Sequence, residues 1–487
     1  MTGVAGLDEI LHGGFARDRV FLLEGSPGTG KTTTAMQFLM TGAAAGERCL
    51  YITLSETEAE LRDAAAAHCW DLAGVEIFEL VPPERLLDEQ QQQSLLYSSD
   101  LELGETTRMI FEAVERVHPD RIVIDSLSEI RLLAQSSLRY RRQVLALKHY
   151  FSRHGATVLM LDDLTSDTTD KTVHSVAHGV VRLEEMLPNY GTERRRVRVL
   201  KYRGRPFRGG YHDFNIKTGG LQVYPRLVAS EHRTLFDRSS VPSDIPGLDA
   251  LLGGGVERGS SALVLGPTGT GKSLLTLYFA LAAVRRGERV GLFIFDEEIG
   301  LLTARAKGLG IDLDALHAQG SLVVQQIDAA EQSPGEFAAR VRSCVGETGA
   351  RTVIIDSLNG YQAAMPEEQF LVLHIHELLQ FLNRQGVTTF LTIAQHGLVG
   401  DMKTPVDITY LADTVILLRY FEARGQVRRA VSVIKKRAGE HETTIREMAV
   451  TAAGVRVGPP LANFQGVLRG IPTFVDDSRT STETAAS

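Results

Sequence analysis

The chain has 487 residues, of which 43% are hydrophobic and 23% are charged, enough for two domains of about 230 residues that each bury a core. A net charge of −8 argues against a protein that coats nucleic acid through bulk electrostatics. The apolar runs have the length of strands and the N-terminus leaves no room for a signal peptide, so we expect no membrane segment. Cys49, Cys69 and Cys344 lack metal-ligand spacing and are expected to be buried, reduced thiols, which favours a cytoplasmic protein.

The first half of the chain alternates short apolar runs with helical segments. We expect a strand at 19–24, a helix at 31–45, strands at 49–54 and 121–125, a helix at 139–153 and a strand at 157–161. Such alternation is typical of a parallel sheet covered on both faces. The segments 180–183 and 196–202 are closely spaced and alternating, which predicts an antiparallel extension of that sheet.

A phosphate-binding loop of the form G-x-x-x-x-G-K-[ST] joins the first strand to the first helix. Its glycines let backbone N–H groups surround phosphates, its lysine reaches the terminal phosphates, and its hydroxyl is placed to bind Mg²⁺. A second copy follows 241 residues later. The expected nucleotide-binding residues are Gly25, Ser26, Pro27, Gly28, Thr29, Gly30, Lys31, Thr32 and Thr33, and Gly266, Pro267, Thr268, Gly269, Thr270, Gly271, Lys272, Ser273 and Leu274.

The repeat extends beyond these loops, since Gly6-Leu7-Asp8 recurs at the same offset as Gly247-Leu248-Asp249. The second half is expected to have strands at 261–265, 290–295, 352–356 and 388–393, and an antiparallel pair at 414–420 and 429–436. We therefore predict an α/β fold of two homologous, mainly parallel, doubly wound domains, residues 1–230 and 231–460. Residues 461–487 are expected to form an apolar loop and a disordered tail.

Each half also provides carboxylates at the ends of expected strands. Asp125 and Asp356 each follow an apolar run and precede Ser-Leu, and they are the predicted Mg²⁺-binding carboxylates beside Thr32 and Ser273. A second acidic group follows the second strand of each half, with Glu56 in the first and Asp296 and Glu297 in the second. These residues, with Lys31 and Lys272, are the predicted catalytic groups, although acidic residues at these positions could also be solvated helix starts.

The tandem loops, the acidic residues, the Asp-Ser-Leu sequences and the sequences ITYLADTVILL at 408–418 and TIRE at 444–447 resemble the KaiC family of tandem RecA-like ATPases, over residues 1 to 460. The family includes the circadian clock ATPase and kinase. The resemblance implies a two-tiered homohexamer that binds ATP and Mg²⁺ between neighbouring protomers. It further implies that two Lys-x-Arg pairs, Lys201 with Arg203 and Lys435 with Arg437, reach the adjacent subunit's nucleotide. The alternative interpretation of these residues is a basic, solvated strand edge.

The chain departs from that family at the groups that would act on the attacking oxygen. Clock members have Glu-Glu after the second strand, whereas this chain has Ser55-Glu56 and Asp296-Glu297. The first domain therefore either uses Glu56 or hydrolyses slowly, since loss of a general base costs about 10²- to 10⁴-fold in rate. The family's autophosphorylated Ser-Thr pair corresponds to Thr409 and Tyr410, so autokinase activity is a hypothesis for Thr409 alone.

Two other functions stay open. A DNA-dependent recombinase or helicase-like ATPase would use the basic run at 194–198, although the acidic net charge and the lack of four cysteines for a zinc ribbon argue against it. A nucleotide-gated signalling scaffold with little catalysis would fit Ser55. The chain itself is the expected partner, as a homohexamer; signalling proteins could dock on the C-terminal tail, and no nucleic acid or membrane partner is expected.

Overall fold

The computed structural model describes residues 1–80, 95–164, 172–187, 191–364, 368–395, 409–451, 454–469 and 473–474. The chain forms two compact units, Met1–Arg226 and Leu227–Ser487. The C-terminal tail beyond residue 474 lies outside the described residues, so the predictions made for it are not tested.

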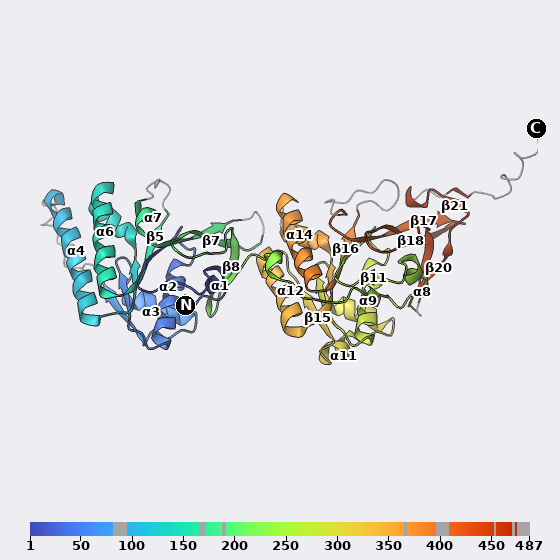
Figure 1. The fold of residues 1–487 in the computed structure, drawn as a ribbon, viewed down its shortest axis with the longest axis horizontal. Helices are drawn as coiled ribbons and strands as arrows, with labels where there is room; N and C mark the ends of the chain where they lie inside the picture. The colour runs from blue at the N-terminus through green and yellow to red at the C-terminus, as the bar shows by residue number, and fades with distance from the viewer. Residues whose placement is uncertain are drawn as a thin grey trace, which may run out of the picture. The chain divides into compact units, whose positions relative to one another are not determined.

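The first unit contains a nine-stranded sheet in the order β3-β2-β4-β5-β1-β6-β7-β8-β9. Figure 1 labels β5, β7 and β8 of this sheet. The strands from β3 to β6 are parallel to their neighbours, whereas β6 to β9 pair antiparallel. The strands are β1 (Val20–Gly25), β2 (Cys49–Thr53), β3 (Val75–Glu79), β4 (Arg121–Asp125), β5 (Thr157–Asp163), β6 (Gly179–Met186), β7 (Arg194–Tyr202), β8 (His212–Lys217) and β9 (Gly220–Tyr224).

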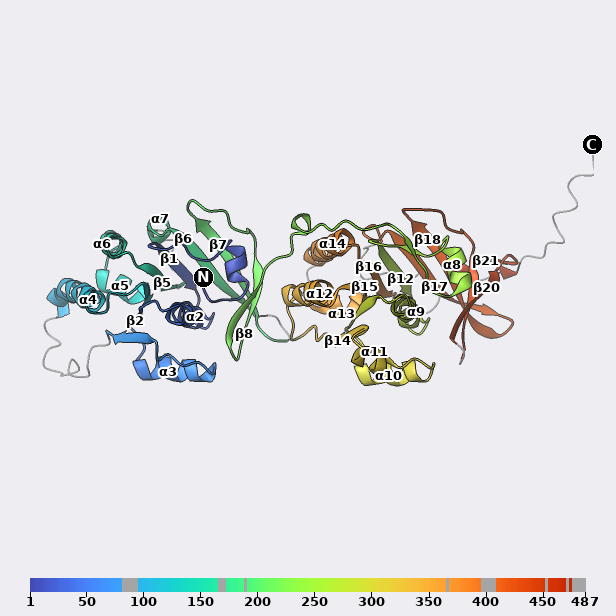
Figure 2. The same ribbon diagram turned by 60° about the horizontal axis from the view of Figure 1, so that its bottom comes forward.

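Helices cover both faces of this sheet because successive residues of each strand point to opposite faces. Phe21 and Leu23 of β1 pack with residues of α2 and α3, while Leu22 packs with residues of α4, α5 and α6 on the other face. Figure 2 shows α2 and α3 on one side of the sheet and α6 and α7 on the other. The helices are α1 (Leu7–Ile10), α2 (Lys31–Ala44), α3 (Glu58–Ala67), α4 (Leu95–Val117), α5 (Leu127–Ala134), α6 (Ser137–His154) and α7 (Thr172–Val176).

The second unit repeats this topology in a nine-stranded sheet, β14-β13-β15-β16-β12-β17-β18-β19-β20. Its strands are β12 (Ser261–Gly266), β13 (Arg289–Ile294), β14 (Leu322–Gln326), β15 (Ala350–Asp356), β16 (Thr388–Ala394), β17 (Thr414–Ala423), β18 (Gln426–Lys436), β19 (Arg446–Thr451) and β20 (Gly454–Pro460), with short pairs β10 (Ser240–Val241) with β11 (Val256–Glu257) and β21 (Phe464–Gln465) with β22 (Thr473–Phe474). Its helices are η3 (Ala229–Glu231), α8 (Pro246–Leu251), α9 (Lys272–Arg285), α10 (Ile299–Lys307), α11 (Leu313–Ala318), α12 (Pro334–Thr348), α13 (Leu358–Ala364), α14 (Glu368–Arg384) and η4 (Val467–Arg469).

The predicted fold class is confirmed, including the antiparallel extension in which Val180 pairs with Lys201 and Val415 with Lys435. The sequence did not predict the edge strands β3 and β14, because they carry solvent-facing polar residues. It also did not predict the last two strands of each sheet. The prediction that all three cysteines are buried is wrong for Cys69, which is exposed in the turn after α3. Among the described helices, none combines the length and hydrophobicity that a membrane crossing needs.

Candidate functional site: two phosphate-binding loops with different carboxylates

The two phosphate-binding loops have the same internal geometry. The Lys31 ammonium donates to the carbonyls of Gly25 and Ser26, both at 2.9 Å, and Lys272 donates to those of Gly266 and Pro267 at 3.0 and 2.9 Å. The hydroxyl of the loop threonine closes each turn at 2.8 Å, from Thr29 to Ser26 and from Thr270 to Pro267. Both lysines are therefore held at the mouth of their loop by contacts that an incoming phosphate can replace.

Each loop leads directly into a helix whose first N–H groups have no side-chain cap. Gly30 and Gly271 precede α2 and α9 with φ of 93° and 101°, a left-handed conformation that favours glycine. The uncapped N–H groups and the helix dipole together make this end of each helix suitable for binding anionic phosphate. The remaining loop residues, Pro27, Gly28 and Thr33, and Thr268, Gly269 and Leu274, lie in the same two segments.

Asp125 lies beside the first loop at the carboxyl end of β4. Its carboxylate accepts hydrogen bonds from Thr32 at 3.3 Å and from the buried Tyr51 hydroxyl at 2.5 Å. Burial raises the pKa of Asp125; the bonds from Tyr51 and Thr32 and the charge of Lys31 oppose this rise, and Asp163 adds to it. A hydroxyl and a carboxylate at this separation are the hard oxygen ligands that Mg²⁺ prefers, so the residues present fit the ion.

Asp356 ends β15 beside the second loop, but a different side chain holds it. Thr392 of β16 donates to its carboxylate at 2.5 Å. The repeat offsets place Leu292 where the first unit has Tyr51, and Leu161 where the second unit has Thr392. Each unit therefore orients its strand-end aspartate from a different neighbouring strand. Burial lowers the pKa of Lys272, and the charge of Asp356 opposes that shift.

Glu56 follows β2 and lies close to the other acidic groups of the first site. The turn that carries it is closed twice by Thr53, whose hydroxyl accepts from the Glu56 N–H at 3.0 Å and donates to its carbonyl at 2.8 Å. Burial raises the pKa of Glu56, and the charges of Asp125, Glu60 and Asp163 raise it further. The Glu56 carboxylate thus lies within electrostatic reach of Asp125 beside the phosphate-binding loop, and its catalytic role stays a prediction.

In the second site the two acidic residues after β13 point to different partners. The Ser357 hydroxyl donates to Asp296, which brings the Asp296 carboxylate to the end of β15, next to Asp356. Glu297 instead pairs with Arg305 of α10 at 2.8 Å. The first unit has Ala64 where the second has Arg305, so Glu56 is not held by an arginine in this way. Asp296 is therefore better placed than Glu297 to act at the second nucleotide.

The structure adds a carboxylate that the sequence analysis did not single out. Asp163, the last residue of β5, pairs in register with Gly25 and lies 2.7 Å from the Lys31 ammonium. The expected strand was 157–161, so the acidic pair Asp162-Asp163 directly after it was the available signal. In the second unit, Ala394 occupies the equivalent position opposite Gly266.

A buried row of charges crosses the first sheet beside this site. Glu24, whose side chain is 3% exposed, contacts His174 Nε2 and Arg182 at 2.7 Å, and its register neighbour Asp162 pairs with Arg131. The second unit has Leu265, Leu417 and Ile393 at the register positions of Glu24, Arg182 and Asp162. The two units thus share a backbone but differ in the polarity of the interior behind the loop.

The Lys-x-Arg pairs lie near the amino ends of the parallel strands, whereas the loops lie at the carboxyl ends. Lys201 pairs with Val180 at the start of β6 and donates to the carbonyls of His174 and Ala177, while Arg203 donates to that of Ser175 at 2.7 Å. In the second unit Lys435 donates to the carbonyls of Thr409 and Ala412 at 2.9 and 2.7 Å, and Arg437 to that of Tyr410 at 2.5 Å. The structure therefore does not bring these cations to the loop of their own unit.

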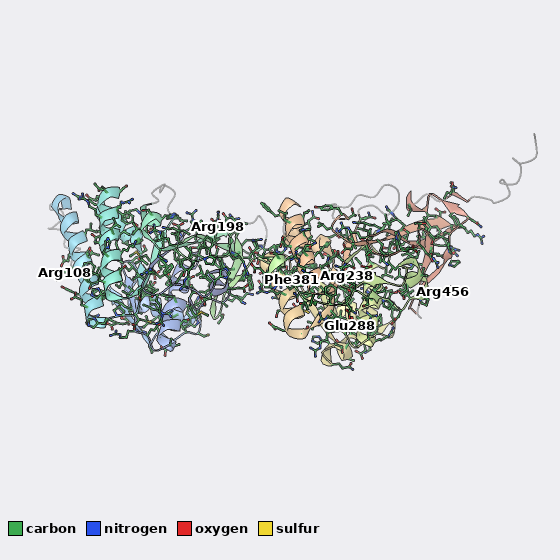
Figure 3. The ribbon with its side chains drawn as sticks, in the orientation of Figure 1. Arg108, Arg198, Arg238, Glu288, Phe381 and Arg456 are labelled. Carbon is green, nitrogen blue, oxygen red and sulfur yellow. The ribbon has the colours of Figure 1, made fainter. Side chains whose placement is uncertain are left out.

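The basic run at 194–198 lies on β7, where Figure 3 labels Arg198. Arg195 pairs with Glu185 at 2.9 Å and Arg196 with Glu184 at 2.8 Å, and the Arg196 and Arg198 guanidiniums lie over the Tyr211 ring. Two of these arginines are thus neutralised across the β6–β7 hairpin, which leaves less cationic charge for a polyanion than the sequence suggests.

Comparison with known proteins agrees with this geometry. The family described as KaiC ATPase matches residues 1–228 and again residues 241–462. The chain is 29% identical to the circadian clock protein KaiC3 of Synechocystis sp. over 98% of this chain and 95% of the relative. It is 30% identical to the circadian clock oscillator protein KaiC of Prochlorococcus marinus, over 98% and 96%, and 29% identical to that of Thermostichus vulcanus, over 97% and 92%. The chain belongs to the KaiC family of ATPases, with two tandem family domains.

Proposed function

We propose that this protein binds one Mg²⁺-ATP at each of its two loops and hydrolyses it in a two-tiered homohexamer, where each site is completed by the Lys-x-Arg pair of a neighbouring copy. The observation that carries this proposal is the separation of the two halves of the site. The loops and carboxylates lie at the carboxyl ends of the parallel strands, whereas Lys201, Arg203, Lys435 and Arg437 lie at the amino ends. A folded unit cannot bring both to one nucleotide, but two copies can.

The positive charges near the amino ends of the parallel strands in the first sheet support this arrangement. Lys201 lies near Arg203 and Lys148, and burial followed by these two charges lowers the Lys201 pKa. Burial also lowers the pKa of Lys148, with contributions from Arg203 and Arg19. Cations that crowd one another in this way gain stability from an anion placed between them. The terminal phosphate of a neighbour's nucleotide is such an anion.

A cavity near the amino ends of the parallel strands in the second sheet gives independent support. It has a volume of about 610 Å³, and its lining includes Arg437, Arg233, Arg238 and Arg384. Arg238 and Phe381, both labelled in Figure 3, mark the 233–238 segment and helix α14 beside it. The lining also includes the acidic Glu257 and Asp413, and Asp413 pairs with Arg437 at 3.3 Å. Four guanidiniums against two carboxylates leave a net positive lining, which favours a phosphate-bearing surface over a neutral one.

The proposed reaction assigns separate roles to the residues of one copy and its neighbour. The loop amides, Lys31 and Lys272 hold the phosphates, and Thr32 with Asp125, and Ser273 with Asp356, hold Mg²⁺, which neutralises charge on the phosphates. Carboxylates at Glu56 and Asp296 receive a hydrogen bond from the attacking water. The neighbour's Arg203 or Arg437 stabilises the charge that develops on the phosphoryl oxygens, an effect worth about 10³- to 10⁵-fold in other phosphoryl-transfer enzymes.

A mixing experiment tests whether the sites are shared. One variant carries Arg203→Ala and Arg437→Ala, and the other carries Lys31→Ala and Lys272→Ala. Each variant alone should release phosphate slowly, while a mixture reassembled with ATP should recover a substantial part of the wild-type rate, because intact loops then face intact arginines. Sizing chromatography with ATP, with ADP and without nucleotide checks that each variant enters the ring.

The result that would contradict shared sites is a mixture whose rate equals the average of its two components although mixed rings form. A wild-type chain whose turnover equals that of the Lys31→Ala, Lys272→Ala variant would contradict hydrolysis itself. That second result would favour a nucleotide-gated scaffold.

Autophosphorylation of Thr409 is a second candidate activity, and one contact favours it. The carbonyl of Thr409 accepts from Lys435 at 2.9 Å, so Thr409 lies at the same edge as the Lys435–Arg437 pair. If that edge faces a neighbour's nucleotide, the Thr409 hydroxyl oxygen can attack its terminal phosphorus. The bond from that phosphorus to the bridging oxygen breaks, ADP leaves, and the hydroxyl proton is released to solvent.

Phosphopeptide mapping after incubation with ATP and Mg²⁺ tests this activity. Phosphate should appear on Thr409 of a Lys272→Ala chain when that chain is mixed with a Thr409→Ala chain whose second loop is intact. Absence of phosphate on Thr409 in the wild-type chain would remove the autokinase proposal.

A further inference from the structure

We propose that Asp163 is the third carboxylate of the first nucleotide site and orients the attacking water there, a role that Asp296 has in the second site. This inference rests on the proposed hydrolysis and extends it to a residue that neither the loop sequence nor the family match identifies.

The position of Asp163 places it in the site. Strand β5 runs parallel to β1, and their register sets Asp163 opposite Gly25, the first residue of the loop. Its carboxylate contacts the Lys31 ammonium at 2.7 Å and is 30% exposed, so it is accessible to water. When nucleotide phosphates replace the Gly25 and Ser26 carbonyls as acceptors for Lys31, the Lys31 ammonium contacts both Asp163 and the terminal phosphates.

The two units differ in which strand carries one of their carboxylates. The first site has Glu56, Asp125 and Asp163, and the second has Asp296, Glu297 and Asp356. Where the second unit has Asp296 after β13, the first has Ser55, and where the first has Asp163 as the last residue of β5, the second has Ala394. The backbones match at both positions, so each unit has three acidic residues at these strand ends, although a different strand carries the third.

The electrostatic coupling of these groups agrees with a shared cluster. Burial raises the pKa of Glu56, and the charges of Asp125, Glu60 and, last, Asp163 add to that rise, so Asp163 lies within electrostatic reach of Glu56. Like charges are costly to hold together without a counter-ion, and Lys31 is the nearby cation. Such a cluster beside a phosphate-binding loop is more typical of a catalytic site than of a structural one.

The proposed step is a hydrolysis. Water donates a hydrogen bond to the Asp163 carboxylate, its oxygen forms a bond to the terminal phosphorus, and the bond from that phosphorus to the bridging oxygen breaks. ADP leaves with the electron pair, and the proton of the water passes through the carboxylate to solvent. Strand β4, which ends at Asp125, lies between β5 and β2. Glu56, which follows β2, is therefore on the opposite side of Asp125 from Asp163 and provides a second acceptor.

The test measures the first site alone, in full-length protein whose second loop is inactivated by Lys272→Ala. Asp163→Asn should lower single-turnover phosphate release about 10²-fold, while the affinity for a fluorescent ATP analogue, measured by titration, stays equal or becomes tighter because a negative charge has been removed. Adding Ser55→Asp to Asp163→Asn should restore at least a tenth of the rate, since it copies the second site. Asp163→Glu should keep part of the activity.

The matched control is Ala394→Asp in a Lys31→Ala background, which adds a carboxylate to the second site where Asp296 already serves, and should not raise the rate. If Asp163→Asn speeds both binding and phosphate release, Asp163 instead restrains Lys31 and the proposal is wrong. The same holds if the rate is unchanged, or if Ser55→Asp restores nothing in a folded variant. If the Lys272→Ala parent releases phosphate no faster than the chain with both loops inactivated, the proposed hydrolysis in the first unit is wrong as well. This comparison distinguishes a failure of the proposed hydrolysis from a failure of the role proposed for Asp163.

Discussion

The hydroxyl of Tyr51 donates a 2.5 Å hydrogen bond to the carboxylate of Asp125, and Leu292 occupies the equivalent place in the second unit. Tyr51→Phe keeps the ring and removes this bond. Bonds to charged groups contribute about 1.5–3 kcal/mol, so we expect the first unit to lose about 2 kcal/mol of stability and the first site to require more Mg²⁺ for half-maximal activity.

Urea unfolding followed by Trp70 fluorescence measures the stability effect. Trp70 is the chain's single tryptophan and packs against His68 in the first unit, at a ring distance of 4.7 Å. The control is Thr392→Val, which removes the corresponding bond to Asp356 and should leave the Trp70 transition unchanged. A Tyr51→Phe chain with wild-type stability and Mg²⁺ dependence would show that the bond has no role.

The buried Glu24–Arg182 pair predicts a coupled effect of two substitutions. Glu24→Leu copies Leu265 but leaves Arg182, 30% exposed, without its main partner, and should cost about 3 kcal/mol. Adding Arg182→Leu copies the second unit and should recover most of that loss. If the double variant is as unstable as the sum of the two single variants, the pair is not coupled.

The same pair predicts how the effect depends on pH. Burial alone would raise the pKa of Glu24, but bonds and charges from His174 and Arg182 bring it below its ordinary value of 4.5. A lowered carboxyl pKa stabilises the folded state above about 4.5, and this contribution is lost as the pH falls through the folded pKa. The stability difference between wild type and Glu24→Leu should therefore shrink in acid.

His212 predicts a second, separate pH dependence of the first unit. Burial lowers its pKa to about 4 from 6.5, and its Nδ1 accepts the Arg226 N–H at 2.8 Å, which fixes a neutral imidazole with the proton on Nε2. Between pH 6.5 and about 4 the unfolded chain takes up a proton that the folded chain does not. The free energy of unfolding should therefore fall over this range, by up to about 3 kcal/mol, and be unaffected by His212 above it.

His212→Gln provides the control, because its amide can accept from Arg226 and donate to the Arg208 carbonyl without titrating. Trp70-monitored unfolding at several pH values should show a shallower slope for this variant between pH 6.5 and 4. An identical slope would assign the pH dependence to other groups.

The two acidic residues of the second site should differ in importance. Asp296 accepts from Ser357 next to Asp356, while Glu297 is held by Arg305 at 2.8 Å. In a Lys31→Ala background, Asp296→Asn should lower phosphate release about 10²-fold or more, and Glu297→Gln less than about 5-fold. The reverse order would assign the catalytic role to Glu297, and single-turnover assays distinguish the two.

The sequence predicted the parts of the fold that depend on local pattern. The loops, the central strands and the antiparallel pairs were predicted because apolar runs and glycine spacing encode them directly. The contacts of Tyr51, Thr392 and Asp163 were not, because each depends on strand register, which brings together residues 74, 36 and 132 positions apart. The partners of Glu297 and Asp296 likewise required a helix or a neighbouring strand to be placed in space.

The separation of each loop from its Lys-x-Arg pair has a consequence for cells that contain unequal copies of the protein. Suppose that every site takes its loop from one copy and its arginine from the next. A copy whose loops and arginines are both inactive then disables two sites in each tier: the site that uses its loop and the neighbouring site that needs its arginine. A minority of such copies would then reduce activity more than their share of the total, so the corresponding alleles should behave as dominant rather than recessive.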